Sequence, residues 1–412
     1  MLDIDRIKTN KKEVETILNK RNIKVDLNYI LELDGKRHHL QMEVQSLREQ
    51  RNKVSRLPPA EARVKGKEIK VQLKNLEPQL DHLLQELNNL LKTLPNDLHP
   101  QVPTGKDESE NKVIRTVGEI RKFSFTPLDH TLLAKKLNII DFDKASKVTG
   151  SNFYFFKNEL VELELALVKY AMDLLKSKGF TLFTTPDISK NSILEGIGFQ
   201  PKGPETQVYN LEGTDLSLIG TAEVTLGGYH ASETVDAKNL PLKYAGISHC
   251  FRTEAGGYGR ESRGLYRVHQ FTKVEMFIYC LPQDSDKMHE YLLAIEEEIY
   301  RSLGLPYRVV DIASGDLGAP AYRKFDLEVW LPGMKKWGEV TSTSNCTDYQ
   351  SSRLKIKYRH EGQSNYLHTL NGTAVTSSRL PIALLENYQQ EDGSIKIPSV
   401  LHKYLNFKSI GT

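Results

Sequence analysis

The chain has 412 residues, of which 39% are hydrophobic and 26% are charged. This composition is typical of a globular protein, and the length is sufficient for two or three domains. The formal net charge of +3 excludes a uniformly basic nucleic-acid-binding protein, so any basic surface must be local. The sequence has no run of about 18 apolar residues, and we therefore expect no membrane span.

The three cysteines, Cys250, Cys280 and Cys346, are 30 and 66 residues apart. This spacing fits neither a zinc site nor a disulfide framework, so we expect free thiols, no zinc and a cytoplasmic location. The opening segment Met1–Asp5 contains acids and lacks the basic and apolar run of a secretory signal, which supports the same location.

The N-terminal part of the sequence predicts an antiparallel helical hairpin. Two seams of apolar residues recur in steps of three and four, as in a coiled coil, and a helix-breaking turn, Leu57–Ala60, separates them. We expect an arm over about 27–94, with a kink near Asn75–Pro78 because Pro78 removes a helical hydrogen bond. The two seams consist of Ile30, Leu33, Leu40, Val44, Leu47 and Val54, and of Ile69, Leu73, Leu76, Leu80, Leu83, Leu87, Leu90 and Leu94.

The distal half of this arm is basic. Between Lys36 and Asn75 there are eleven Lys and Arg residues and four Glu residues, which gives a local charge of +7. A solvated helix face is the ordinary interpretation of such a stretch. On an isolated arm, however, this charge favours a phosphate backbone as partner, bound in a salt-dependent way.

A proline-marked linker follows the arm, and we place a domain boundary after residue 105, giving domains at 1–105 and 106–412. Regular alternation of strands and helices is rare in the second domain. We therefore expect an α+β fold, with a mixed, mainly antiparallel sheet flanked by helices. The predicted elements are helices over 160–178 and 379–389 and strands over 180–185, 208–209, 243–252, 267–280, 327–331 and 338–341.

An arginine-rich hairpin, Phe251–Phe271, is the most unusual segment of the second domain. It combines four glycines with several arginines and glutamates, and its exit alternates polar and apolar residues as a strand does. Guanidinium groups bind phosphates and carboxylates in a bidentate manner, and divalent metals prefer hard oxygen ligands. The chain lacks both the P-loop and the glycine motif of dinucleotide-binding folds, so a nucleotide would need a different cradle.

Several motifs, in the correct order, resemble those of class II aminoacyl-tRNA synthetases in the form that seryl-tRNA synthetases use. The resemblance extends over the whole chain and includes the N-terminal arm. The matching segments are Phe251–Glu254 with Arg267–Phe271 (second motif), Pro186 after the long helix (first motif), Asn371–Gln389 (third motif), Thr221–Glu223 (the TxE element) and Glu339–Gln350 (the strand with metal ligands).

This resemblance implies binding roles for individual residues. Glu339 and Ser342 would hold the Mg²⁺ that accompanies ATP, and Arg252 and Arg379 would act in catalysis. The implied ATP-binding residues are Arg252, Thr253, Glu254, Arg267, Val268, Phe271, Glu339, Val340, Thr341, Ser342 and Arg379. The implied serine-binding residues are Thr221, Ala222, Glu223, Arg252, Glu275, Asn371 and Thr373.

In this scheme Arg252 would bridge the α-phosphate of ATP and the serine carboxylate. Glu254 would accept a hydrogen bond from the adenine amino group, and Phe271 would stack on the ring. Arg267 and Arg379 would hold the γ-phosphate. The reaction would need no protein acid or base, because the serine carboxylate attacks the α-phosphorus directly and the protein supplies placement and charge stabilisation.

The resemblance therefore implies a serine–tRNA ligase that activates L-serine with ATP to seryl-adenylate and charges the 3′ end of tRNA(Ser). A pocket in which Glu275 and Thr373 hydrogen-bond the serine hydroxyl would leave polar groups unpaired with alanine. The arm would bind the long variable arm of tRNA(Ser). A homodimer would form through the helix and strand that end at Pro186.

Three other interpretations remain open. A ligase that charges a carrier protein would share the catalytic domain but lack the long arm. A non-catalytic RNA-binding paralogue would be expected to lack one of four residues that are all present here, namely Arg252, Glu254, Glu339 and Arg379. A second copy of the enzyme, resistant to an inhibitor that resembles seryl-adenylate, would carry the same motifs. The residues interpreted without a role in the reaction are Cys250 and Cys346 (buried), His249 and His269 (locally hydrogen-bonded), and Arg260 and Arg263 (solvated loop).

Overall fold

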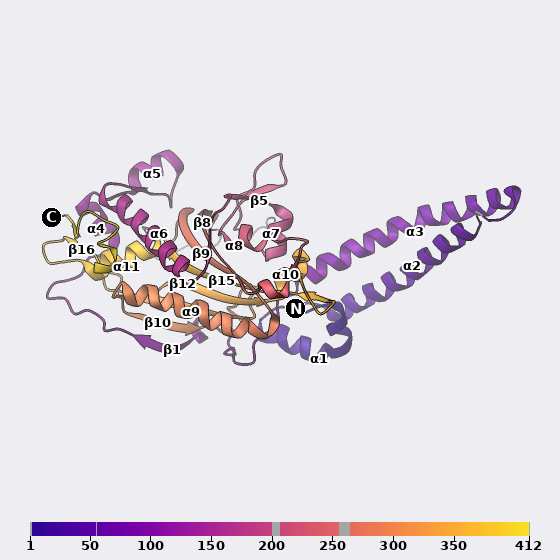
Figure 1. Cartoon of the computed structure of the whole chain (residues 1–412), viewed down its shortest axis with the longest axis horizontal. Coiled ribbons are helices and arrows are strands. Elements are labelled where there is room, and N and C mark those ends of the chain that lie inside the picture. Colours follow the sequence, from indigo (N-terminus) through magenta and orange to yellow (C-terminus); the bar gives the residue numbers. More distant parts are fainter. Residues whose placement is uncertain (1, 55, 200–206, 255–263, 412) are drawn as a thin grey trace. The chain divides into compact units, whose positions relative to one another are not determined.

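The structure is a computed structural model that describes residues 2–54, 56–199, 207–254 and 264–411 (Figure 1). The chain divides into two compact units, Met1–Asp97 and Leu98–Thr412. The domain boundary that we predicted after residue 105 lies a few residues beyond the division between these two units. Each unit contains a hydrophobic cluster of its own.

The first unit contains the predicted helical hairpin. Val44 and Leu47 of one helix pack with Ile69 and Leu73 of the other, so the two predicted seams face each other. The second of these helices begins at Pro59, where a helix needs no backbone amide donor. It continues through Pro78 as a single helix. The helices of this unit are α1 (Ile4–Lys20), α2 (Leu27–Val54) and α3 (Pro59–Thr93).

The second unit is built on an eight-stranded sheet. All neighbouring strands in it are antiparallel except the last pair, β8 and β4, which is parallel. The predicted mixed, mainly antiparallel sheet is therefore confirmed. In sheet order the strands are β1 (Lys112–Val117), β10 (Tyr307–Asp311), β11 (Arg323–Leu331), β12 (Lys336–Thr347), β15 (His368–Thr376), β9 (Gln270–Cys280), β8 (Leu242–Phe251) and β4 (Thr181–Thr184).

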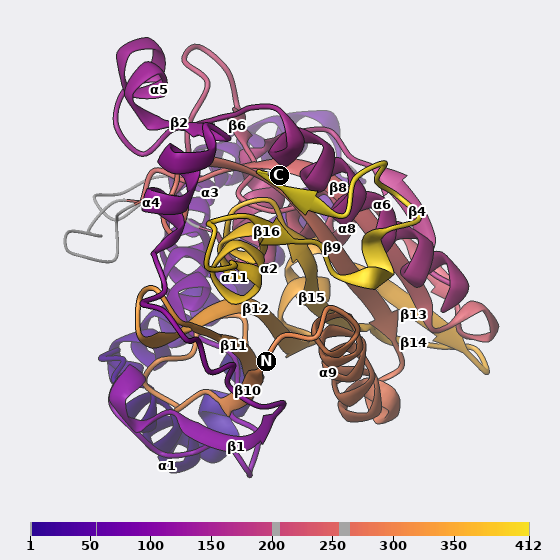
Figure 2. The same ribbon diagram turned by 90° about the vertical axis from the view of Figure 1, so that its left-hand side faces the viewer.

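The two faces of this sheet have different surroundings, as β9 illustrates. Its residues Val274, Met276 and Ile278 face a large core, whereas Phe277 and Tyr279 belong to a smaller cluster, because successive side chains of a strand point to opposite faces. Figure 2 shows the helices of the large core beside the strands. The large core contains α4 (His130–Leu137), α6 (Glu159–Ser177), α9 (Ser285–Ser302) and α11 (Arg379–Tyr388); the smaller cluster contains α7 (Asn191–Ile197), α8 (Glu223–Gly227) and α10 (Tyr349–Leu354).

Most elements predicted from the sequence are present, with shifted ends. The strand predicted over 267–280 begins only at Gln270, so Arg267 and Val268 lie before it. The prediction of a strand over 208–209 is wrong, because the backbone there forms no strand. The apolar side chain of Val208 is instead buried from a loop, in a small cluster with Leu194 and Ile219. The elements that were not predicted include β1, β10, β15 and α9.

The cysteines and histidines behave as interpreted. All three cysteines are buried and free, and burial raises the pKa of Cys280 to about 12. His249 pairs with Asp187 at 2.8 Å through Nδ1, and His269 Nδ1 lies 3.0 Å from a backbone carbonyl oxygen. Over the described residues, none of the helices combines the length and apolarity needed to cross a membrane.

Candidate active site

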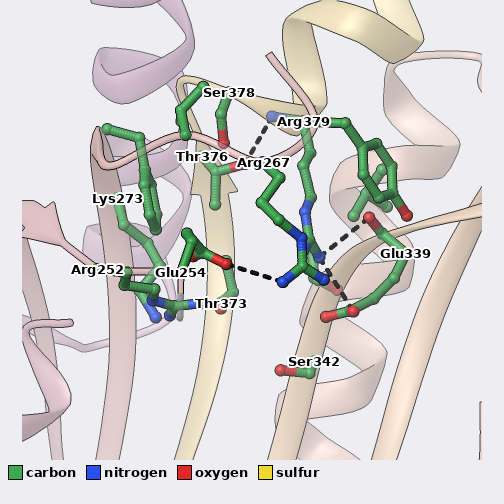
Figure 3. A pocket seen from close by; sticks show the side chains of 15 residues that line it. Arg252, Glu254, Arg267, Lys273, Glu339, Ser342, Thr373, Thr376, Ser378 and Arg379 are labelled. Carbon is green, nitrogen blue, oxygen red and sulfur yellow. Dashed lines mark hydrogen bonds and ion pairs between the residues drawn. The ribbon is translucent and has the colours of Figure 1, made fainter. Parts of the chain in front are cut away.

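A cleft with two adjoining chambers lies over β9, β15 and β12 of the second unit. Four residues line both chambers and mark their junction: Arg252, Lys273, Ser342 and Thr373. The arginine-rich chamber (Figure 3) is also lined by Glu254, Tyr266, Arg267, Val268, Phe271, Glu339, Val340, Thr341, Thr376, Ser378 and Arg379. The carboxylate chamber is also lined by Thr221, Glu223, Glu275, Lys324, Ser344, Cys346 and Asn371.

Strand alternation places the polar residues of β9 in this cleft. Phe271, Lys273 and Glu275 are two residues apart and therefore share one face of the strand, and all three line the cleft. The same face continues into the apolar cluster of Phe277 and Tyr279. One strand face thus changes from a polar site to a hydrophobic core along its length, and the buried position of Glu275 follows from this arrangement.

Arg379 and Glu339 form the main ion pair of the arginine-rich chamber. Arg379 Nη1 lies 3.0 Å from Glu339 Oε2, and the Arg379 guanidinium lies 5.0 Å from the centre of the Tyr266 ring. Burial opposes the charge on Glu339, but the cations of Arg379 and Lys324 outweigh burial and lower the pKa of this carboxyl to about 2. Glu339 is therefore ionised at neutral pH.

The second ion pair of this chamber joins two residues that were predicted to contact different parts of ATP. Arg267 Nη1 donates to Glu254 Oε2 at 3.0 Å, as Figure 3 shows. The backbone of Glu254 is left-handed, with a φ of 51°, an uncommon conformation for a residue with a side chain. Both side chains are thus held at the cleft by each other and by the local backbone.

Arg252 is held at the junction of the two chambers. Its Nε donates to the Gly220 carbonyl oxygen at 3.2 Å, and its guanidinium lies 5.2 Å from the centre of the Phe271 ring. Over the described residues, the hydrogen bond to Gly220 uses one N–H group of the planar guanidinium, which has further donors for an anion in the cleft.

The carboxylate chamber contains the buried acid Glu275, the half-buried acid Glu223 and two lysines, Lys273 and Lys324. Lys273 Nζ lies 2.5 Å from Glu275 Oε2. Glu223 Oε1 accepts from Gln350 Nε2 at 2.7 Å and from Asn371 Nδ2 at 2.9 Å. Burial raises the pKa of Glu223 to about 7, and the nearby Glu275 adds to this effect. The Glu223 end of this chamber therefore suits a small cation with hydrogen-bonding groups.

Oxygen ligands for a divalent metal are also present in the cleft. The Glu339 carboxylate and the Ser342 hydroxyl line the arginine-rich chamber, and Asp326 on β11 is the register partner of Ser342. Directly paired residues of antiparallel strands point to the same face. Ionised carboxylate and hydroxyl oxygens form a donor set that fits a hard cation such as Mg²⁺.

Most of the residues predicted for the site lie together in this cleft, but four differ in their placement. Ala222 packs in the smaller cluster, and Thr253 is not among the cleft residues. Val340 and Thr341 line the arginine-rich chamber, but the Val340 side chain packs in the large core, and the Thr341 hydroxyl donates to Glu296 of α9 at 2.8 Å. Ligand contacts of Val340 and Thr341 in the cleft would therefore involve their backbone. Arg260 and Arg263 lie outside the described residues.

Sequence reasoning missed several cleft residues, of which Lys273 is the most important. It lies between Phe271 and Glu275 in the two-residue period of the strand, and this spacing could have identified it. Tyr266, Lys324 and Cys346 carried no comparable signal, because their positions depend on contacts between distant parts of the sequence. These residues line the cleft as well.

The mixed, mainly antiparallel sheet, with Arg252, Arg267 and Arg379 in a cleft over its strands, is the arrangement of a class II aminoacyl-tRNA synthetase core. Residues 207–388 match the family model described as the tRNA synthetase class II core domain (G, H, P, S and T). Residues 1–98 match the seryl-tRNA synthetase N-terminal domain. These two matches place the class II core in the second unit and the family-specific domain in the first.

Curated relatives specify the family further. The chain is 54% identical to a serine–tRNA ligase of Dictyoglomus thermophilum, with 100% of this chain and 99% of the relative covered. It is 50% identical to a serine–tRNA ligase of Treponema denticola, with both chains fully covered (100%). The chain therefore belongs to the seryl-tRNA synthetase family, and its function is that of a serine–tRNA ligase.

Solved structures agree over the whole chain. The seryl-tRNA synthetase of Pyrococcus horikoshii, solved with ATP, is 40% identical with a TM-score of 0.92, covering 100% of this chain and 99% of the other. A cytoplasmic serine–tRNA ligase of Naegleria fowleri, solved with AMP, is 31% identical with a TM-score of 0.87, covering 98% and 96%. The match of the N-terminal domain argues against a carrier-protein ligase without an arm.

Proposed function

We propose that the arginine-rich chamber binds ATP, that the carboxylate chamber binds L-serine, and that seryl-adenylate forms at their junction. The observation that carries this proposal is the position of Arg252, which lines both chambers. A guanidinium at this position can hold the α-phosphate and the serine carboxylate at the same time. The seryl group would then be transferred to the 3′ end of tRNA(Ser).

The remaining nucleotide contacts follow the arrangement of the arginine-rich chamber. Phe271 offers a ring face for adenine, and Glu254 and the Val268 backbone offer its polar partners. Arg267 and Arg379 would hold the γ-phosphate. Because these arginines now pair with Glu254 and Glu339, we expect ATP to share or replace those pairs when it binds.

The chemical step requires placement more than proton transfer. One oxygen of the serine carboxylate attacks the α-phosphorus, the bond to the β-phosphate oxygen breaks, and pyrophosphate leaves. The Arg252 guanidinium would stabilise the charge that builds on the α-phosphate oxygens. Binding both reactants in adjoining chambers keeps the serine carboxylate close to the α-phosphorus, which two molecules free in water would achieve only at a large cost in entropy.

The carboxylate chamber fits the other two groups of serine. Glu223, with Thr221 and the backbone of Ala222, would receive the ammonium group, and the cation would favour the ionised form of this carboxyl. Glu275 and Thr373 would bind the side-chain hydroxyl; the Thr373 hydroxyl already donates to Glu275 at 3.4 Å. Asn371 would support this end of the pocket through its contact with Glu223.

Glu339 and Ser342 are the residues that we propose to hold Mg²⁺ together with ATP. Their oxygen atoms fit this ion, because Mg²⁺ prefers hard oxygen ligands and the lowered pKa of Glu339 keeps its carboxylate ionised. Bound there, Mg²⁺ would neutralise part of the triphosphate charge and make pyrophosphate a better leaving group. The backbone next to these residues, at Val340 and Thr341, would approach the nucleotide.

We assign tRNA(Ser) binding to the first unit, because its helical hairpin carries the basic stretch described above. An RNA helix is mainly recognised by shape and backbone, and exposed lysines on a rigid arm suit this mode. Aminoacylation uses the ATP and tRNA of the cytoplasm, where we expect the protein to act.

We further propose a homodimer that covers the outer face of α6 and β4. Leu165 on α6 is 64% exposed, and Val161 and Leu182 are exposed as well. Apolar side chains gathered on adjoining elements favour a protein interface. The strand leads directly to Pro186, at the end of the segment that resembles the first motif.

The proposal is tested by serine-dependent exchange of pyrophosphate into ATP, without tRNA, using serine, alanine, threonine and glycine. We expect exchange with serine alone. Removal of residues 36–75 should abolish tRNA charging and leave exchange unchanged. A folded protein that binds Mg²⁺·ATP but catalyses no exchange with any of the four amino acids would contradict the proposed reaction.

A further inference from the structure

A buried histidine–glutamate pair lies beside the arginine-rich chamber and has no role in the reaction described above. His130, the first residue of α4, is 2% exposed, and Glu386 on α11 is 0% exposed. Glu386 Oε1 accepts from the backbone N–H of His130 at 3.1 Å and lies 3.2 Å from its Nδ1. A buried carboxylate is costly unless it is well hydrogen-bonded, so its other partners are informative.

The second oxygen of Glu386 holds the turn between β11 and β12. Glu386 Oε2 accepts from the backbone N–H groups of Gly333 at 2.9 Å and Met334 at 3.3 Å. This turn leads into β12, which carries Glu339. One carboxylate therefore connects the helix that begins with Arg379 to the strand that carries the ion-pair partner of Arg379.

His130 extends this connection to the arginine-rich hairpin. Its Nε2 accepts from the backbone N–H of Leu265 at 3.2 Å, so Nδ1 carries the proton that is donated to Glu386. The approach is close: a Cβ atom at Gly264, whose φ is +68°, would lie 2.2 Å from His130 Nε2. Only glycine fits at this point of the chain.

The residues after Leu265 belong to the chamber. Tyr266 provides the ring beneath the Arg379 guanidinium, and Arg267 pairs with Glu254. Besides the Tyr266–Arg379 contact, the segment that carries Arg267 and the helix that carries Arg379 are joined through a hydrogen-bonded relay, Leu265–His130–Glu386. A displacement of this relay would change the separation of the two arginines.

We propose that His130 and Glu386 are positioning residues that set the spacing between Arg267 and Arg379 and thereby determine the affinity for the triphosphate of ATP. This inference rests on the proposed function, in which these two arginines bind the γ-phosphate. The pair acts through the backbone of the chamber and touches no substrate. Leu265, His130 and Glu386 do not line the carboxylate chamber, so we expect the relay to affect serine binding less than ATP binding.

Two substitutions of His130 separate its two hydrogen bonds. His130→Asn keeps an amide donor near the position of Nδ1 but is too short to reach Leu265. His130→Gln places an amide oxygen near the position of Nε2, where it can accept from Leu265. We expect the Asn variant to raise the KM for ATP in pyrophosphate exchange about tenfold, as for the loss of one hydrogen bond. We expect the KM for serine to remain within about twofold and the Gln variant to recover most of the ATP affinity.

His289→Asn is the matched control. His289 is 3% exposed and bonds a backbone carbonyl, that of Thr343, at 3.1 Å on the α9 side of the sheet. We expect this variant to lose thermal stability like the His130 variants but to keep the KM for ATP. Equal changes in the KM for ATP and serine in His130→Asn, or a changed KM for ATP in His289→Asn, would overturn the inference.

Direct calorimetry of Mg²⁺·ATP binding separates this inference from the proposed function. Wild-type protein that binds ATP but gives no exchange would overturn the proposed function alone. Unchanged ATP affinity in His130→Asn, with an active wild type, would overturn the relay. If His130→Asn does not fold, Gly264→Ala makes the same test, because its added methyl group displaces Leu265 from an intact His130, and a wild-type ATP affinity in that variant would contradict the proposal.

Discussion

In the arginine-rich chamber each of two carboxylates is paired with a guanidinium, whereas in the carboxylate chamber the acids Glu223 and Glu275 share the lining with two lysines. The ion pairs lower the pKa of Glu339 to about 2, while burial and a neighbouring acid raise the pKa of Glu223 to about 7. In the proposed function, the first chamber would receive the triphosphate of ATP, and Glu223 in the second chamber would receive the ammonium group of serine.

The largest effect is expected where the two chambers meet. Arg252→Ala removes the group that we assign to both ligands, and we expect the kcat for pyrophosphate exchange to fall by about 10³-fold, as for the loss of a donor that stabilises developing charge. Arg359→Ala, an exposed residue of β13 (Lys357–His360), should retain wild-type exchange. A fall of less than tenfold in Arg252→Ala would remove the basis for the shared role.

The next effect concerns the carboxylate chamber alone. Glu275→Gln replaces the acceptor that we assign to the serine hydroxyl, and we expect the preference for serine over alanine to fall by about 10²-fold. The KM for ATP should change little, because Glu275 does not line the arginine-rich chamber. The ratio of kcat/KM values for serine and alanine in the exchange assay measures this effect. Glu290→Gln, an exposed acid on α9, is the control.

A pH profile sharpens the contrast between the chambers. Glu223 must be ionised to bind an ammonium group, so kcat/KM for serine should fall about tenfold for each pH unit below about 7. The affinity for ATP should show no such dependence on Glu223. In Glu223→Gln, kcat/KM for serine should be low at every pH and should no longer change with pH near 7. A wild-type profile that is flat from pH 5.5 to 8 would contradict the assignment.

The same group has an opposite effect on folding. Its folded pKa of about 7 exceeds the ordinary value of 4.5, so the folded state binds this proton more tightly than the unfolded state. Its contribution to stability is therefore fully present below about pH 4.5 and is lost as the pH rises through about 7. Denaturant unfolding of wild type and Glu223→Gln should show the difference in unfolding free energy changing across this window.

The smallest expected effect leaves both chambers intact. Replacing the exposed residues Lys65, Lys67, Lys70 and Lys74 of α3 by Ala should raise the KM for tRNA(Ser). The slope of log affinity against log salt should decrease by about 0.7 to 0.9 for each phosphate group that the arm no longer neutralises. Pyrophosphate exchange should be unchanged. Lys396→Ala on β16 (Ile395–Lys396) is the control. An unchanged salt slope would exclude this face of the arm from the tRNA interface.

The arm was predictable from the sequence because the spacing of apolar residues within each helix is sufficient to identify the residues that face the other helix. Heptad spacing identified Val44, Leu47, Ile69 and Leu73 as facing residues, and the proline turn identified the loop. The structure confirms these positions. In the second unit, the strand period of β9 and the motif spacing identified Phe271 and Glu275 for the same reason.

The remainder required tertiary information. The edge strand β1 has no distinctive flanking signal. The side chain of Val208 is buried from a loop, so its apolar character does not indicate a strand. The partnership of Glu386 with His130 joins positions 256 residues apart, and no local pattern specifies it. Lys273 is intermediate: it was not predicted, although its spacing from Phe271 and Glu275 could have placed it on the correct face, and its pairing with Glu275 depends on the surrounding sheet.

The burial of all three cysteines has a practical consequence for studying the arm. Thiolates are the reactive form, and burial keeps Cys250, Cys280 and Cys346 protonated and shielded. A cysteine introduced at the exposed Val64 of α3 would therefore be the one fast-reacting thiol of the chain. A fluorophore attached there would label the arm at a single site, and its signal would follow the docking and release of tRNA during turnover.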